Sequence, residues 1–396
     1  MISKKFPPMR ILMLAPTPYF SDRGCHVRIF EEAQALTRRG HQVEIVAYHL
    51  GRDHGGIPVT RIPRIPWYRK TSAGPSWHKP YLDVLVFFTA LRAARHLRPH
   101  VIHAHLHEGA FVGALLKPFL GVPLLLDCQG SLSGELLDHG FMRRDGVLHR
   151  CFAVLERWIV RRADAIVTSS TPTAQAMRVA YPGAGGRLTS LPDGVDVEVF
   201  RPMGKDQALC KKLGIPAGQR VIVYLGAMSD YQGIGVLLDV LKTLAAKRHD
   251  FHALLMGYPE AEYARRAAEM GLADRVTFTG RIDYAEAPRY LALGDIAVSP
   301  KLSTTEANGK LLNYLACGLP CVAFDSPVNR ELLGETGVYA AYASADDFAF
   351  RVAALLDSPA EMALRSRQSR DHAVTHHSWM ARIGVLEDVY QKMTLK

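Results

Sequence analysis

Two successive series of short apolar runs, most of them followed by a stretch with helical periodicity, limit the possible folds of this chain most strongly. Several runs are apolar almost throughout, which is typical of parallel strands covered by helices on both faces. We therefore predict an α/β protein made of two doubly wound domains. The predicted strands are 10–15, 42–48, 101–104, 124–127, 165–169 and 188–191 in the first series, and 220–225, 252–256, 275–278, 296–299 and 321–324 in the second.

The boundary between the two series is predicted near residues 200–218, where Pro, Gly and Lys precede a fresh apolar run. A length of 396 residues suits two domains. We predict an N-terminal, acceptor-side domain at 1–200 and a C-terminal, donor-binding domain at 201–375. The segment 376–396 is predicted as a final helix with one apolar stripe, returning to the first domain.

The net charge of +10 favours anionic partners, such as phosphorylated substrates, nucleic acid or an anionic membrane surface. The case for nucleic-acid binding rests on charge alone, because no docking motif supports it. We therefore expect no nucleic acid to bind. The longest apolar stretch, 109–126, is broken by Lys117, Pro118 and Pro123, so no membrane span is expected. Six scattered cysteines and the absence of a secretory signal favour the cytoplasm.

Two polar segments of the first half follow predicted strands. The loop 16–26 contains Gly24 and precedes a helix predicted to start near Val27, at a sheet edge where ligands bind. An ordinary turn fits this segment equally well. His103, His105 and His107 form an H-x-H-x-H run at a strand end. Because no carboxylate spacing typical of zinc enzymes accompanies them, we expect them to line the acceptor side and predict no metal.

The most informative segment is 299–327, in which a polar loop joins a strand to a short helix at 310–316. A glycine allows close approach, a lysine neutralises phosphate, and a carboxylate accepts hydrogen bonds from sugar hydroxyls. The alternative is a solvated loop with a capped helix, and the convergence of these groups favours a ligand site. The candidate residues of this loop are Lys301, Glu306, Asn308, Gly309 and Lys310.

Two further segments suit a membrane or an acceptor. Residues 141–163 read as a basic amphipathic helix, with Arg143, Arg150, Arg157 and Arg161 on one face. Such a helix either docks on anionic headgroups or packs in the core with a solvated face. The basic, aromatic segment 61–79 either contacts an acceptor or is a surface loop.

Along nearly its whole length the chain resembles the GT-B glycosyltransferases, family 4 in particular. No single motif is specific, but the set is. The supporting motifs are the first strand and loop with Gly24, G-H-x-V at 40–43, V-I-H-A-H at 101–105, L-P-D-G-V-D at 191–196 with F-x-P at 200–202, Y-L-G at 224–226, A-C-G-L-P at 316–320 and the last helix with Trp379.

The resemblance implies two Rossmann-like domains facing a cleft, with a nucleotide-sugar donor mostly in the second. It implies glycosyl transfer with retention and without an obligatory metal or other cofactor. The donor would be a UDP-sugar, a GDP-sugar or a similar compound. A sugar or lipid-linked acceptor is expected, in glycolipid or polysaccharide synthesis, with the enzyme associated with the inner face of the membrane.

Several family positions depart from the usual pattern. The family's E-x7-E pair falls on Thr305, beside Glu306, and on Asn313. Ala227 or Met228 and Gln232 replace the usual Arg and Lys after the second domain's first strand, and Gln129 replaces a histidine. Because polar groups remain, we interpret the chain as a divergent enzyme in which Lys310 balances the departing diphosphate.

The site assignments follow from these segments and the resemblance. As catalytic residues we predict Glu306, Lys310 and Gln129; as donor-binding residues Gly24, Gly226, Gln232, Arg281, Ile282, Asn308, Gly309, Leu311 and Asn313; and as acceptor-side residues His105 and His107. Because the family's usual Arg and Lys after the second domain's first strand are missing, the alternative is a non-catalytic partner subunit that binds a nucleotide sugar. A sugar phosphorylase or epimerase on the same architecture is a second enzymatic interpretation.

Overall fold

The computed structural model describes residues 6–21, 24–71, 76–130, 146–303 and 307–395. The chain divides into two compact units: residues 1–193 with 382–396, and residues 194–381. The units separate between 193 and 194 rather than between 200 and 201, and the functional roles predicted for the two domains stay predictions. Among the described helices, none combines the length and the apolar character that a bilayer span requires.

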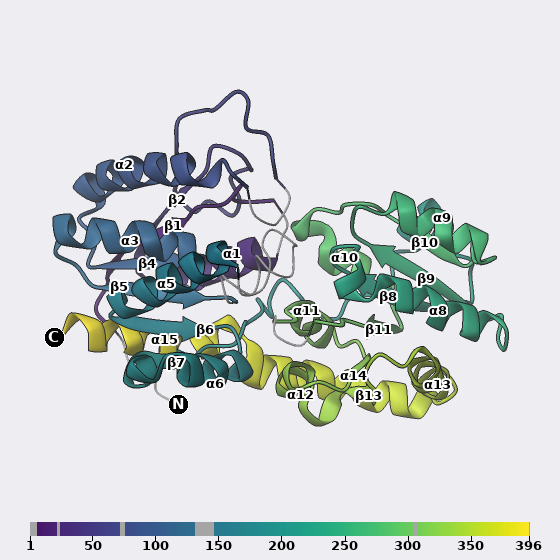
Figure 1. The fold of residues 1–396 in the computed structure, drawn as a ribbon. Helices are drawn as coiled ribbons and strands as arrows, with labels where there is room; N and C mark the ends of the chain where they lie inside the picture. Colours follow the sequence, from purple (N-terminus) through teal and green to yellow (C-terminus); the bar gives the residue numbers. More distant parts are fainter. Residues whose placement is uncertain (1–5, 22–23, 72–75, 131–145, 304–306, 396) are drawn as a thin grey trace. The chain divides into compact units, whose positions relative to one another are not determined.

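The first unit contains a parallel sheet in the order β3-β2-β1-β4-β5-β6-β7 (Figure 1). Its central strands are buried along almost their whole length, as expected where helices cover both faces. The strands are β1 Arg10–Ala15, β2 Gln42–Ala47, β3 Val59–Arg61, β4 Val101–His105, β5 Leu124–Cys128, β6 Ala165–Thr168 and β7 Leu188–Ser190. The helices are α1 Gly24–Arg38, α2 Lys79–Leu97, α3 Leu106–Leu120, α5 Val147–Arg162 and α6 Thr171–Ala180, with a 3-10 turn at Pro182–Arg187.

The second unit repeats the design with a parallel sheet in the order β10-β9-β8-β11-β12-β13. Its strands are β8 Arg220–Leu225, β9 Phe251–Met256, β10 Val276–Phe278, β11 Ile296–Ser299, β12 Cys321–Phe324 and β13 Val338–Ala340. The α-helices are α7 Gln207–Lys212, α8 Ile234–Ala245, α9 Ala261–Glu269, α10 Ala287–Leu291, α11 Lys310–Ala316, α12 Pro327–Leu333, α13 Ala345–Leu356 and α14 Pro359–His372. Shorter turns lie at Asp230–Gln232, Tyr284–Glu286 and Gly334–Thr336, and a π-helical turn at Ala373–His377. The predicted two-domain α/β class is therefore confirmed.

The last helix, α15 (Trp379–Thr394), packs most of its length in the first unit. Glu387 of α15 lies 2.9 Å from the Arg39 guanidinium and 3.0 Å from His41. Tyr390 places its hydroxyl 2.7 Å from His103 Nδ1. These buried polar contacts tie the end of the chain to α1 and to β4.

The sequence located the central elements well and the peripheral ones poorly. β1, β8, β11, β12 and α11 have the predicted bounds. α1 begins at Gly24 rather than near Val27, so Gly24 opens the helix instead of lying in the preceding loop. The three-residue edge strands β3 and β13 were not predicted: β3 reads V-T-R, without an apolar run, and β13, V-Y-A, is apolar but very short.

Candidate functional site

In each sheet the strand order reverses at one point, and ligands of doubly wound proteins bind at such a point, outside the carboxyl ends of the strands. In the second unit the reversal lies between β8 and β11. The segment 226–232 follows β8, and the segment 300–310 follows β11. The predicted residues Gly226, Gln232, Asn308 and Lys310 belong to these two segments and so share this edge of the sheet.

Two glycines bring these segments close together. At Gly233, where φ is +77°, a Cβ atom would lie 1.9 Å from the carbonyl oxygen of Pro300. At Gly226, where φ is +150°, a Cβ atom would lie 2.9 Å from Cε of Lys310 and 3.1 Å from its Nζ. The backbone conformation disfavours a side chain at both positions, and at Gly233 the Pro300 backbone also leaves no space for one. The Lys310 side chain therefore lies directly over the Gly226 backbone.

The Lys310 ammonium group bonds two uncharged side chains. It donates to Oε1 of Gln232 and, at 3.3 Å, to the hydroxyl of Tyr224. It also lies 4.7 Å from the centre of the Tyr224 ring, as in a cation–π contact. The Tyr224 hydroxyl in turn donates to the carbonyl of Ala227 at 2.9 Å. These contacts orient the ammonium group at the edge of the sheet, and a lysine at such a place suits an anionic ligand.

The loop after β11 is anchored by a buried amide network. Asn308 donates to Ser299 Oγ at 3.0 Å and to Asn329 Oδ1 at 2.8 Å. Buried Lys301 donates to the carbonyl of Ala307 at 2.7 Å. The Asn308 side chain is thus used to position the loop, and what it offers a ligand is its backbone.

The remaining predicted residues of this segment lie on or beside α11. Gly309 precedes the helix, Leu311 is fully buried, and Asn313 is 8% exposed. The helix has seven residues, so its dipole is small and the charge at this edge comes mainly from Lys310. Glu306 lies outside the described residues, and its predicted role stays a prediction.

Arg281 and Ile282 lie on the loop after β10. This strand forms one edge of the second sheet, on the opposite side from β12. They line an open hollow of about 330 Å³ together with Thr279, Asp283, Glu286 and Tyr290. The Arg281 guanidinium lies 5.6 Å from the centre of the Tyr258 ring. Both predicted residues thus line this hollow, whereas Lys310, Tyr224 and Gln232 are not among its described lining residues.

In the first unit the polar residues at the sheet edge form an ion cluster, namely Arg28, Glu32, Asp127 and Asp193. Arg28 donates to both oxygens of Asp127, at 2.8 and 3.0 Å, and to Asp193 at 2.7 Å. It also lies 3.0 Å from Glu32, one turn further along α1. The register of β4 with β5 sets His105 beside Asp127, and Nδ1 of His105 lies 2.9 Å from Oδ2.

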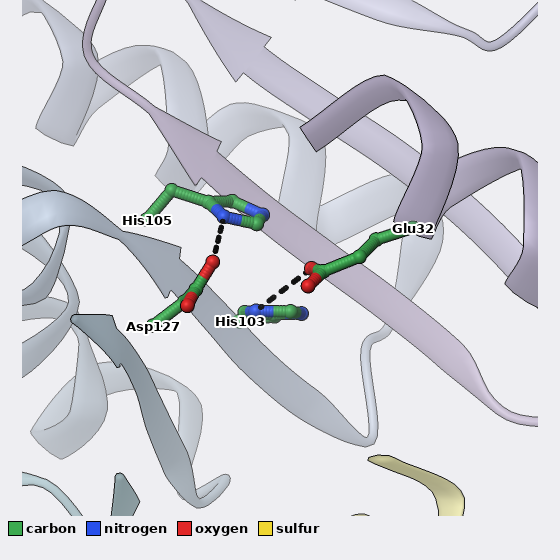
Figure 2. Close-up of side chains that lie close together, drawn as sticks. All are labelled: Glu32, His103, His105 and Asp127. Carbon is green, nitrogen blue, oxygen red and sulfur yellow. Dashed lines mark hydrogen bonds and ion pairs between the residues drawn. The ribbon is translucent and has the colours of Figure 1, made fainter. Parts of the chain in front are cut away.

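Figure 2 shows how this cluster meets two histidines: Glu32 comes from α1, His103 and His105 from β4, and Asp127 from β5. Burial and the nearby carboxylates raise the pKa of Glu32 well above its usual range, although Arg28 opposes them. Burial alone would raise the pKa of Asp127, but Arg28 and His105 hold it well below its usual range. Burial lowers the pKa of both His103 and His105. At neutral pH we therefore assign the buried charges to Arg28 and Asp127.

Within the described part of the chain, the group Glu32, His103, His105 and Asp127 has the composition of a metal site, with ligand atoms within 4.8 Å of one another. The chemistry of the neighbourhood disfavours a cation there. Arg28 already bonds both oxygens of Asp127 and lies against Glu32, so a metal ion would have to approach a fixed positive charge.

The predicted residues of the first unit are positioned around this cluster. Gln129 donates to Asp127 at 3.1 Å, at the carboxyl end of β5. His105 is fully buried against Asp127. His107 is also buried and lies on α3 rather than on the strand, 3.6 Å from Glu156. Their predicted contacts with an acceptor stay predictions, and the contacts they make are with their own unit.

Sequence reasoning missed the ion cluster and the role of Tyr224. The i, i+4 spacing of Arg28 and Glu32 was visible, but such pairs usually lie on solvated faces. Asp127 ends a fully apolar run, and a carboxylate in that position signals a buried partner. That partner is 99 residues away in the sequence, and no local pattern identifies it.

Two family models match this chain. Residues 23–194 match a model described as "Glycosyl transferase 4-like domain", and residues 219–358 match "Glycosyl transferases group 1". The D-inositol 3-phosphate glycosyltransferase 2 of Catenulispora acidiphila is 28% identical, covering 93% of this chain and 90% of the relative. The 2-deoxystreptamine N-acetyl-D-glucosaminyltransferase of Streptomyces fradiae is 29% identical, covering 81% and 78% respectively.

Solved structures with low identity share the fold. Sucrose-phosphate synthase from Thermosynechococcus elongatus aligns with a TM-score of 0.78 at 18% identity, covering 97% of this chain and 99% of that one. Anabaena HepE in complex with UDP and glucose aligns with a TM-score of 0.75 at 17% identity, covering 97% and 100%. Taken with the two matched models, which cover both sheets, these similarities show that the chain belongs to the GT-B glycosyltransferases of the family 4 type, as a divergent member.

Proposed function

We propose that this glycosyltransferase moves a sugar from a nucleoside-diphosphate sugar to an acceptor hydroxyl with retention of the anomeric configuration. The observation that supports it most is the Lys310 ammonium group, fixed by Tyr224 and Gln232 at the reversal point of the second sheet. A diphosphate needs a positive charge at such a point, because its negative charge grows as it departs.

The proposed chemistry assigns one task to each group. The bond from the anomeric carbon to the phosphate oxygen breaks, a bond to the acceptor oxygen forms on the same face, and the acceptor proton passes to the departing phosphate. Lys310 offsets the charge of the leaving group. Asn313 holds the ribose and Glu306 a sugar hydroxyl, as the family resemblance suggests. Because Lys310 supplies the charge, the proposal includes no metal ion.

We place the activity in glycolipid or polysaccharide synthesis, with a sugar or a lipid-linked acceptor. The basic residues of the first unit suit an acceptor that carries phosphate or resides at an anionic membrane surface. The same architecture could also carry out phosphorolysis or epimerisation, and product analysis separates these reactions from transfer. Transfer releases a nucleoside diphosphate and forms a new glycosidic bond.

The test combines a thermal-shift panel of UDP, GDP, ADP and their sugars with Lys310→Ala. We expect one nucleotide family to raise the melting temperature of the wild type, and the shift to be lost in Lys310→Ala. Transfer should fall roughly 10²- to 10³-fold, the usual effect of removing one group that stabilises transition-state charge. Lys242→Ala on α8, an exposed lysine of the same unit, is the matched control. If Lys310→Ala binds and transfers like the wild type, the assignment of the site is wrong.

A further inference from the structure

An exposed apolar surface on the first unit has no role in the chemistry above. We call it the aromatic face, and it consists of Trp67, Trp77, Tyr81, Val84, Phe88, Leu115 and Phe119. The four most exposed members are Trp67 at 70%, Trp77 at 76%, Phe88 at 61% and Phe119 at 68%. Isolated exposed apolar residues need no explanation, but a contiguous group of them marks a surface that contacts something apolar.

The members of the aromatic face are linked to one another. The Trp67 indole donates to the Tyr81 hydroxyl at 3.2 Å, which joins the loop before α2 to the helix itself. On α2, Tyr81, Val84 and Phe88 follow helical spacing along one exposed side. Phe87 lies between Phe88 and Phe119, with ring centres 5.3 and 5.8 Å away, and so connects α2 to α3. The two helices lie side by side in Figure 1.

The same side of α2 becomes basic one turn later. Arg92 and Arg95 are exposed and continue the stripe of Val84 and Phe88. Tyr81 and Arg95 are 14 residues apart, which is about 21 Å along a helix. An apolar stripe that ends in arginines is the pattern of a helix lying in a membrane interface, where long basic side chains reach the headgroups.

Charge is concentrated around the aromatic face. Residues 61–120 contain nine Lys and Arg and two Asp and Glu, so this segment carries +7 of the chain's net charge of +10. Asp83 is buried, Glu108 pairs with Lys79 at 2.5 Å, and acids outside the segment pair with Arg61 and Lys117, so the exposed arginines of α2 and of the loop before it carry the surface charge. The exposed arginines Arg64 and Arg69 lie beside Trp67 in the sequence. An occupant of this surface must therefore be both anionic and apolar.

From the aromatic face and its surrounding charge we infer that this side of α2 and α3 docks on a bilayer containing anionic phospholipid. Trp and Tyr prefer the headgroup region of membranes, and each nearby Lys or Arg strengthens attraction to anionic lipid. A second copy of the chain fits poorly, because a two-fold interface would set two strongly basic surfaces against each other. The inference rests on the proposed function in one respect, since docking gives the transferase access to a lipid-linked acceptor.

The sequence also offered α5 as a lipid-binding helix. In its second half Ile159 and Val160 are buried, and the Trp158 ring centre lies 5.9 Å from that of Phe111, so this half packs in the core. Val147, Leu148 and Val154 are exposed, but within the described residues of this helix no exposed aromatic ring accompanies them as on the aromatic face. Arg143 lies outside the described residues.

Vesicle flotation of the full chain tests the inference. The probes are phosphatidylcholine vesicles with and without one quarter phosphatidylglycerol. We expect binding to the anionic vesicles only, weakened by salt. Phe88→Ser with Trp67→Ser should lower the partition coefficient at least tenfold, because each side chain loses its apolar burial. Arg92→Glu with Arg95→Glu should lower it by a similar factor.

Matched changes on the second unit control for general effects of polarity and charge. Phe350→Ser, at a 64% exposed phenylalanine, and Arg367→Glu, at an exposed arginine, should bind vesicles like the wild type. Lys310→Ala should bind vesicles fully while losing donor binding. A wild type that transfers sugar but ignores anionic vesicles overturns the docking inference alone, and one that binds vesicles but no nucleotide sugar overturns the proposed function alone.

Three further outcomes would each replace the inference. A dimer in sedimentation analysis that Phe88→Ser abolishes would show that a second copy covers the aromatic face. Retention on single-stranded nucleic acid that depends on Trp67 would identify a different anionic partner. Equal binding of the face variants and the wild type to anionic vesicles would show that charge elsewhere is sufficient.

Discussion

The two sheets reverse their strand order at equivalent points, β1/β4 and β8/β11, yet the edges of the two sheets are built differently. In the first unit Arg28 is surrounded by carboxylates, so the positive charge is matched within the fold. In the second unit Lys310 bonds the uncharged Tyr224 and Gln232. Buried ions that pair with each other hold backbone segments in place, whereas Tyr224 and Gln232 orient the ammonium group without adding a charge of their own. In our proposal the first arrangement serves conformation and the second serves donor binding.

The largest expected effect tests the structural side of this comparison. Arg28→Met removes the charge that matches Asp127, which is left buried without its main partner. We expect the free energy of unfolding to fall by about 3–5 kcal/mol, as for other buried pairs that lose one partner. Urea denaturation measures it. Arg330→Met, at an exposed pair with Asp325, is the matched control and should leave stability unchanged. A loss as small as in this control would mean that Arg28 does not hold the edge.

The second prediction converts one design into the other. Gln232→Glu places a carboxylate against Lys310 with almost no change of shape, so the ammonium group gains an ion pair at the position of its bond to Gln232. We expect nucleotide-sugar affinity to fall roughly 10- to 100-fold, the range for hydrogen bonds to charged groups, while stability is kept. Titration calorimetry measures the affinity. Gln219→Glu makes the same change of net charge at a residue that bonds the carbonyl of His249, and should bind the donor normally. Unchanged affinity in Gln232→Glu would break the comparison.

The smallest effect concerns pH. Burial lowers the pKa of His103, and the neighbouring His105 adds to this. Below about pH 6.5 the unfolded chain therefore binds more protons than the folded chain, and stability present at neutral pH is lost as pH falls. His103→Asn should reduce this loss by at most about 1.4 kcal/mol per pH unit, and by about 1 kcal/mol between pH 6.5 and 5.5. Denaturation at pH 6.5 and 5.5 measures it, with the exposed His96→Asn as control. Equal slopes in wild type and His103→Asn would place the acid sensitivity elsewhere.

The sequence predicts the second edge better than the first for a physical reason. Lys310 lies in a short polar segment that directly follows an apolar strand, so a local pattern reveals it, whereas Gly226 and Gln232 were reached through the family resemblance. The ion cluster joins α1 to β5 and to Asp193, pairings 99 and 165 residues apart that only the folded sheet brings together. α3 was missed because Pro118 interrupts its apolar run, although this proline lies in the helix's last turn, before Gly121. Sequence patterns reveal functional groups that are close together in the chain, but they do not reveal which distant residues neutralise a buried charge.

The packing of α15 has a practical consequence for dissecting the protein. Glu387 and Tyr390 form hydrogen bonds with Arg39, His41 and His103, so the end of the chain is part of the first unit. A clone that stops at residue 193 would expose those buried groups and precipitate. Fusing codons 382–396 to that clone through a flexible linker, or co-expressing them as a peptide, should restore solubility. The affinity of the co-expressed peptide for the first unit would then measure how strongly residues 382–396 bind to it.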